Sequence, residues 1–238
     1  MILERIEFLR RVFRPKRVVG HSKIRIGRQA DGGYVHLDAF DTVFGAISAG
    51  IGDEVSWDAG VVKLLNVSVD QYDHTIDFAP IGHPRLTWRR AGVGPAPGMF
   101  TLAEAVALKD SVLGEPRGDY LLKMDIEGGE WAALIDCPVL GRFSQIVVEL
   151  HDLLTIDVGK IERLAASLNE QHELIHIHGN NCGVCATDAI GDVPETLECT
   201  WVRRDGYAFV AETDLFPIAG LDFPNNPLAE DYQLRWLA

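Results

Sequence analysis

The sequence has no long hydrophobic run, although 47% of its 238 residues are hydrophobic. A membrane-spanning helix needs about 20 consecutive apolar residues, and no stretch of the chain approaches that length. The first residues already include Glu4 and Arg5, whereas the centre of a secretory signal peptide is apolar. We therefore expect a protein without a membrane span and with a cytoplasmic location.

Cysteine is also scarce, with four in the chain: Cys137, Cys182, Cys185 and Cys199. Without an export signal, free thiols are expected rather than disulfides. Cys182 and Cys185 form a single Cys-x-x-Cys pair, whereas a structural zinc site usually has a second pair of ligands. His176 and His178 lie close upstream and keep a zinc site open as an alternative, but buried thiols are the simpler interpretation.

Lysine and arginine are fewer than aspartate and glutamate, and the formal net charge is −13. Because phosphate binding needs a basic surface, this balance argues against a nucleic-acid partner. Residues 1–28 nevertheless contain nine Lys and Arg against two Glu, a balance of +7, so the remaining residues carry −20. Residues 1–22, which begin with apolar residues at helical spacing, are predicted to form a basic helical arm. The arm binds either an anionic partner or membrane surface, or the acidic body of the same chain.

Residues 23–238 are predicted to form one α/β domain, because strand-like and helix-like segments alternate along them. The predicted strands cover residues 42–49, 66–72, 85–90, 120–126, 145–150, 173–178 and 196–203, and a further extended segment covers 207–211. The predicted helices cover residues 57–65, 102–108, 130–135 and 158–171. This alternation favours a parallel sheet covered on both faces. The loop at residues 92–98 then belongs at the carboxyl edge of the strands, where ligands bind.

Two glycines follow the first of these strands, in Ser48-Ala49-Gly50-Ile51-Gly52-Asp53. Such glycines allow a sharp turn and a close approach of a ligand to the backbone, but the third glycine of the dinucleotide fingerprint is absent. Asp73 ends the next strand, about twenty residues after the turn, where an acid can accept hydrogen bonds from ribose hydroxyls; Asp70 is the alternative. The pattern predicts a nucleoside-containing cofactor and leaves NAD and S-adenosylmethionine open.

The strand at residues 120–126 ends in two carboxylates, Asp125 and Glu127, followed by two glycines. Strand alternation puts both side chains on the same side, and charged groups at a strand end are costly unless they bind something. Capping of the next helix by Glu127 and Glu130 is the alternative.

An Asp-Gly-Gly turn at residues 31–33 precedes the sheet, and it either forms a hairpin or caps the pocket through Asp31 or Tyr34.

Titratable side chains also end the next two predicted strands: Glu149 with His151, and His176 with His178. Carboxyl ends of parallel strands meet at one edge of a sheet, so we expect these groups near Asp125. Glu149, His151 or His178 can then act as a general base. A divalent metal held by Asp125, His151 and His178 is a second interpretation. It is not favoured, because a single histidine at a strand end is more often structural.

These segments together resemble the FkbM-type family of S-adenosylmethionine-dependent methyltransferases. The resemblance is strongest in residues 122–131, Leu-Lys-Met-Asp-Ile-Glu-Gly-Gly-Glu-Trp, and extends to residues 26–28, 31–35, 48–52 and 147–151. It implies a Rossmann-like, mostly parallel sheet of seven strands whose last strand is antiparallel. It also implies a cofactor over Gly50 and Gly52, with its ribose held by Asp73, and methylation of a hydroxyl group. His74 departs from the family, which commonly has proline there, and so does the form of the turn at residues 48–53.

The sequence therefore predicts a methyltransferase that acts on a hydroxyl group of a sugar or other small natural product. The expected catalytic residues are Asp125, Glu149, His151 and His178. The expected cofactor-binding residues are Ser48, Gly50, Gly52, Asp73, Asp125 and Glu127. A nicotinamide-dependent oxidoreductase would share the glycine turn and the ribose acid but would not account for residues 125–129, and a non-catalytic relative of the methyltransferases is the third alternative. The acceptor is not identified, and a homo-oligomer is compatible with the sequence.

Overall fold

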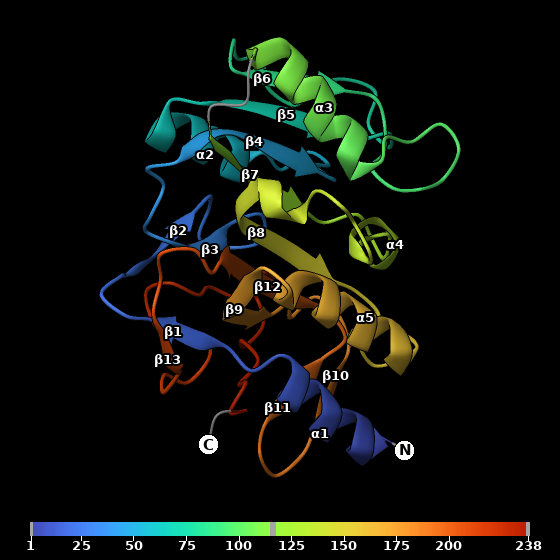
Figure 1. Ribbon diagram of the computed structural model, residues 1–238. Helices are drawn as coiled ribbons and strands as arrows, with labels where there is room; N and C mark the ends of the chain where they lie inside the picture. Colours follow the sequence, from blue (N-terminus) through green and yellow to red (C-terminus); the bar gives the residue numbers. More distant parts are fainter. Residues whose placement is uncertain (1, 115–117, 237–238) are drawn as a thin grey trace.

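The computed structural model describes residues 2–114 and 118–236, and its centre is a seven-stranded sheet (Figure 1). Across the sheet the order is β6 (Leu86–Arg89), β5 (Ser68–Tyr72), β4 (Val43–Ala49), β7 (Asp119–Met124), β8 (Phe143–Leu150), β12 (Leu197–Arg203) and β9 (His172–Gly179). The first five strands run parallel to their neighbours, and β12 is antiparallel to both β8 and β9. The prediction of a mostly parallel seven-stranded sheet with a late antiparallel strand is confirmed.

Helices cover both faces of this sheet. On one face lie α1 (Ile2–Val12), α3 (Leu102–Leu113), α4 (Glu130–Leu134) and α5 (Val158–Asn169), and on the other lie α2 (Ser56–Leu65) and the hairpin of β2 (Lys23–Ile26) and β3 (Tyr34–Leu37). Alternate strand residues pack into the two cores: Leu122 and Val148 into the first, Leu121 and Val147 into the second. Strands that are buried on both faces have continuous runs of apolar residues. For this reason these strands could be predicted from the sequence.

Short elements complete the chain between and after these units. They are β1 (Lys16–Val18), β10 (Cys185–Thr187), β11 (Asp192–Pro194), β13 (Phe209–Ala211) and the 3-10 helix Leu140–Arg142. β10 pairs with β11 and β1 pairs with β13, in both cases antiparallel. No helix in the described part of the chain is long and apolar enough to span a membrane.

The basic N-terminal segment lies against the body of the molecule, at the end of the sheet opposite β6 (Figure 1). Ile6, Leu9 and Phe13 are buried in the first core. Arg10 forms an ion pair with Asp188 in which the atoms are 2.7 Å apart. Of the two interpretations of this segment, the structure therefore shows contact with the chain's own acidic body.

Candidate functional site

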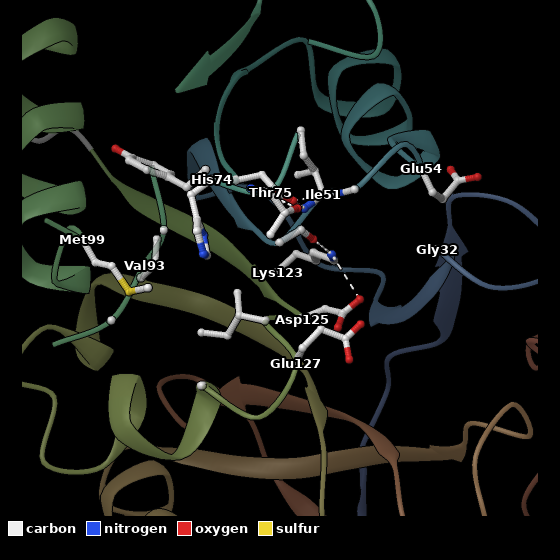
Figure 2. Close-up of a pocket in the computed structure, with 18 of the residues that line it drawn as sticks. Gly32, Ile51, Glu54, His74, Thr75, Val93, Met99, Lys123, Asp125 and Glu127 are labelled. Atoms are coloured by element: carbon white, nitrogen blue, oxygen red, sulfur yellow. Dashed lines mark hydrogen bonds and ion pairs between the residues drawn. The ribbon is translucent and has the colours of Figure 1, made fainter. Parts of the chain in front are cut away.

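A pocket of about 750 Å³ opens at the carboxyl ends of β4, β5 and β7 (Figure 2). From β4 the chain continues to β5 and β6 on one side of the sheet, and later to β7 and β8 on the other. Ligands of doubly wound sheets bind in the crevice at such a reversal of strand order. Part of the loop at residues 92–98 lines the pocket, as predicted, and Figure 2 shows Val93 and Met99 on the side away from Glu54.

Gly50 and Gly52 shape the turn after β4, and both have a left-handed backbone, with φ of +71° and +50°. A Cβ atom on Gly50 would lie 1.6 Å from the carbonyl oxygen of Asp125, so only glycine lets the ends of β4 and β7 approach so closely. A Cβ atom on Gly52 would meet nothing within 4 Å. The first glycine therefore joins the two strand ends, while the second leaves the backbone open to the pocket.

Asp73 closes the same turn from the end of β5. Its Oδ2 accepts hydrogen bonds from the backbone N–H groups of Ile51 (2.9 Å) and Gly52 (2.8 Å), and its Oδ1 accepts them from the N–H (2.7 Å) and hydroxyl (2.6 Å) of Thr75. Burial alone would raise the pKa of Asp73, but these hydrogen bonds outweigh it and lower the pKa. A carboxylate offers about four acceptor positions. Asp73 thus fixes the glycine turn, a role that the sequence did not indicate, and its contact with a ribose stays a prediction.

Two residues considered for cofactor binding lie away from the pocket. Ser48 is completely buried within β4 and is not part of the lining. Asp70, the alternative ribose acid, is bound by Lys109 at 2.5 Å and Arg89 at 3.0 Å. Both residues therefore belong to the interior of the sheet, and the expectation that Ser48 contacts a cofactor directly is wrong for this arrangement.

The hairpin of β2 and β3 brings the Asp-Gly-Gly turn to the pocket, where Asp31, Gly32 and Tyr34 contribute to the lining. Both interpretations of the turn therefore hold, because it forms a hairpin and also borders the pocket. The hydroxyl of Tyr34 lies 3.5 Å from Oδ2 of Asp125. Burial, together with the charge of Asp125, raises the pKa of Tyr34 well above its usual value, so the hydroxyl stays neutral.

The lining of the pocket is acidic. Among the residues that the structure describes, six carboxylate side chains and one lysine line it: Asp31, Asp53, Glu54, Asp73, Asp125, Glu127 and Lys123. The ammonium group of Lys123 donates to the carbonyl oxygen of Gly50 and lies 3.6 Å from Oδ2 of Asp125, and Glu54 pairs with Arg28. Since the lysine is already engaged, the potential in the pocket favours a cationic ligand over one that carries phosphates.

His151, at the end of β8, lies among carboxylates on both sides of its ring. Its Nε2 is 3.4 Å from Glu127, 3.7 Å from Glu149 and 3.9 Å from Asp125, and its Nδ1 is 3.2 Å from Glu130. Burial would lower the pKa of His151, but Glu130, Glu149 and Asp125 raise it to about 9. In this arrangement His151 holds a proton at neutral pH, so it is not the group that removes one from a substrate.

Glu149 has the properties of a general base. It is only 4% exposed; Oε1 accepts a hydrogen bond from Asn180 at 2.7 Å, and Oε2 has no hydrogen-bond partner within the described ranges. Burial, with Asp125 and Glu198 nearby, raises the pKa of Glu149 well above its usual value. A carboxylate with a raised pKa and a free oxygen holds a transferred proton more readily than an ordinary carboxylate. Asn180 positions this carboxylate through its hydrogen bond to Oε1.

His178 does not join the group around His151, which corrects its assignment as a catalytic residue and argues against the unfavoured interpretation of a metal held by Asp125, His151 and His178. Its Nδ1 lies 3.0 Å from Glu198 and its Nε2 lies 3.1 Å from Asp231, so both nitrogens are engaged. Burial would lower the pKa of His178, but Glu198 and Asp231 raise it to about 10. His176 is likewise bound to Asp222, at 2.8 Å. Both histidines therefore have structural partners.

Several residues around the site were missed by sequence reasoning: Lys123, Glu198, Asn225 and Asp231. Glu198 stands directly opposite Glu149 in the antiparallel register of β12 and β8, so a correct register would have found it. Asn225 and Asp231 lie in an irregular C-terminal segment that carries no periodic signal.

Two sets of described side chains bring potential metal-ligating atoms within 4.8 Å of one another: Asp125, Glu127 and His151, and Asp31, Glu149 and Glu198. Neither set contains a cysteine.

Comparison with known proteins adds no assignment, because no protein-family model and no curated protein matches the chain. A functional assignment therefore rests on the geometry and the charge of the pocket.

Proposed function

We propose that the chain is an S-adenosylmethionine-dependent methyltransferase that methylates a hydroxyl group of a small acceptor, such as a sugar or another natural product. The observation that carries this proposal is the acidic pocket at the point where the strand order reverses. S-adenosylmethionine is a nucleoside with a positive sulfonium and an ammonium group and has no phosphate. A nicotinamide dinucleotide would place its negative pyrophosphate against carboxylates.

The residues of the pocket fit such a ligand. Its volume of about 750 Å³ lies in the range of small-molecule sites. Gly52 offers open backbone beside the turn that Asp73 holds in place, and Asp125 with Glu127 borders the opposite side. The resemblance of residues 122–131 to FkbM-type enzymes supports the same assignment.

The chain's own residues supply proton transfer and alignment. When bound, S-adenosylmethionine supplies an activated methyl group, so the protein mainly aligns the donor with the acceptor. Glu149, through its free Oε2, accepts the hydroxyl proton as the acceptor oxygen forms its bond to carbon. Asp125 and Glu127 belong both to the pocket and to the cluster around His151, and they therefore border the acceptor as well as the cofactor.

Calorimetric titration with S-adenosylmethionine, S-adenosylhomocysteine and NAD tests the proposal. We expect micromolar binding of both sulfur compounds and no binding of NAD. A screen of hydroxylated sugars and natural products, read out as release of S-adenosylhomocysteine, then identifies the acceptor. Binding of NAD alone would support an oxidoreductase instead, and binding without turnover on any hydroxyl compound would contradict the enzymatic part.

A further inference from the structure

We propose that Asp125, Glu127 and His151 form a binding site for a divalent transition-metal ion, represented here by Mn²⁺, at the wall of the pocket. The three side chains bring one ligand atom each within 4.8 Å of one another. Figure 2 shows Asp125 and Glu127 beside each other, below Lys123. Only the role of the ion, given below, rests on the proposed methyl transfer; the binding itself does not.

The first argument is the orientation of His151. Its Nδ1 faces Oε1 of Glu130 at 3.2 Å, and the same oxygen accepts a hydrogen bond from the backbone N–H of Ile126 at 2.8 Å. Glu130 is completely buried. Metal-binding histidines usually donate their second N–H to such a carboxylate, which turns the other nitrogen toward the ion. Glu130 therefore fixes the ring with Nε2 directed at Asp125 and Glu127.

The second argument is distance. Ions of this class bind nitrogen and carboxylate oxygen at about 2.0–2.2 Å, which puts neighbouring ligand atoms roughly 3.0–3.5 Å apart. Nε2 of His151 lies 3.4 Å from Oε2 of Glu127 and 3.9 Å from Oδ1 of Asp125. Small side-chain movements therefore suffice to close the shell, and the side chain of Glu127, which is 88% exposed, is free to make them.

The third argument is a buried carboxylate oxygen without a partner beside this group. Glu149 lies 3.7 Å from Nε2 of His151, so four carboxylates, with Glu130 included, surround one imidazole. Glu149 is nine-tenths buried, and its Oε2 has no hydrogen-bond partner in the described part of the chain. A buried polar atom without a partner is costly, and a cation bound beside Glu149 offsets that cost.

The ligand atoms indicate the kind of ion. Carboxylates suit Mg²⁺, Ca²⁺ and Mn²⁺, whereas imidazole suits transition metals, and Mn²⁺ accepts both. At this place the ion would bind the acceptor's hydroxyl oxygen and lower its pKa. The oxygen keeps the electron pair of its O–H bond, and the proton moves to Oε2 of Glu149.

Titration of the full chain, without a histidine tag and without S-adenosylmethionine, with Mn²⁺ tests the site. The paramagnetic resonance signal of free Mn²⁺ reports how much has bound. We expect one ion per chain. Substitution of a ligand, in His151→Gln or Glu127→Gln, should weaken binding by about 100-fold, and Glu130→Gln, which only positions the ring, by about tenfold. His83→Gln and Glu170→Gln, outside the group, should bind Mn²⁺ as the wild type does.

Three results would overturn the proposal: no bound Mn²⁺, equal binding in all variants, or binding lost in Glu198→Gln but kept in Glu127→Gln. The last result would place the ion at Asp31, Glu149 and Glu198 instead. Because the side chain of Glu127 is exposed, Glu127→Gln should not disturb folding. Calorimetry with S-adenosylmethionine separates the two proposals. Binding of the cofactor without binding of Mn²⁺ would contradict only the metal site. Binding of Mn²⁺ without binding of the cofactor would contradict only the methyltransferase.

Discussion

The carboxyl edge of the sheet has two halves that differ in how they present polar groups. At β4, β5 and β6 the backbone of the glycine turn shapes the edge, and the carboxylate of Asp73 is turned toward the N–H groups of that turn. At β7, β8, β9 and β12 the edge carries charged side chains, among them Glu149, His151, His178 and Glu198. The first half depends on backbone shape, and the second depends on charge.

This division explains why the two halves tolerate change differently. A tight backbone turn must change its conformation when a substitution adds a side-chain atom that clashes with it. A charged cluster can lose one group while the backbone around it keeps its conformation. Substitutions in the first half should therefore affect binding and stability together. Substitutions of Glu149 or His178 in the second half, which lie outside the lining of the pocket, should affect proton transfer and pH dependence with cofactor binding preserved.

The largest effect is expected for Gly50→Ala. The new Cβ atom would meet the carbonyl oxygen of Asp125, so the strand ends must separate, at a cost of about 3 kcal/mol or more, and binding of S-adenosylmethionine should be lost. Denaturant unfolding and calorimetry measure both quantities. For stability, Gly52→Ala is the matched control, with a cost of about 1 kcal/mol. Equal losses of stability in both variants would show that the approach of β4 to β7 is unimportant.

A large effect confined to activity is expected for Glu149→Gln. Loss of the base should slow methyl transfer by about 10²- to 10⁴-fold, with the dissociation constant of S-adenosylmethionine unchanged. Single-turnover rates with the acceptor from the screen, together with calorimetry, measure the two quantities. Glu170→Gln, at the end of α5, is the control. An unchanged rate in Glu149→Gln would assign proton removal to another group.

An intermediate effect on stability is expected as the pH rises. The pKa of His178 is raised to about 10 from an unfolded value near 6.5, so its contribution is fully present below pH 6.5 and is lost as the pH approaches 10. The difference in unfolding free energy between the wild type and His178→Gln should therefore shrink by a few kcal/mol across this range, as measured by urea denaturation at several pH values. His83→Gln should follow the wild type. A constant difference would mean that His178 is neutral in the folded protein.

The smallest effect is expected for Thr75→Val. The variant loses the hydroxyl hydrogen bond to Asp73 but keeps the one from the backbone N–H, a loss of about 1 kcal/mol. If Asp73 transmits this loss through the glycine turn, the dissociation constant of S-adenosylmethionine should rise about fivefold. Thr87→Val, on β6, is the control. Equal affinities of the two variants for S-adenosylmethionine would show that the hydroxyl of Thr75 does not contribute to binding in the pocket.

The fold could be read from the sequence because its signals are local. The apolar runs that gave the strands are continuous. The largest error in a helix concerns the predicted helical arm at residues 1–22, where α1 ends at Val12 and residues 16–18 form β1; α3, expected to end at residue 108, extends to Leu113. The antiparallel position of the last strand came from the family resemblance. Propensity alone does not indicate which neighbours such a strand pairs with.

The candidate site could be read only where its residues are close in sequence. Asp125, Glu127 and the glycine turn were found because each follows a strand. His178 was misassigned because its partners, Glu198 and Asp231, come from other segments of the chain. Asp73 was found, but its backbone partners were not, because the path of a turn depends on contacts that no local pattern encodes.

The pairing of β1 with β13 also bears on the order of events during synthesis. Residues 16–18 find their partners only at residues 209–211, so this pair can form only after all the strands of the central sheet have been synthesised. Until then the apolar side of α1, with Leu9 and Phe13, has no complete core to enter. Contacts so distant in sequence slow folding, and apolar surface that stays exposed in the meantime favours aggregation of partly folded chains.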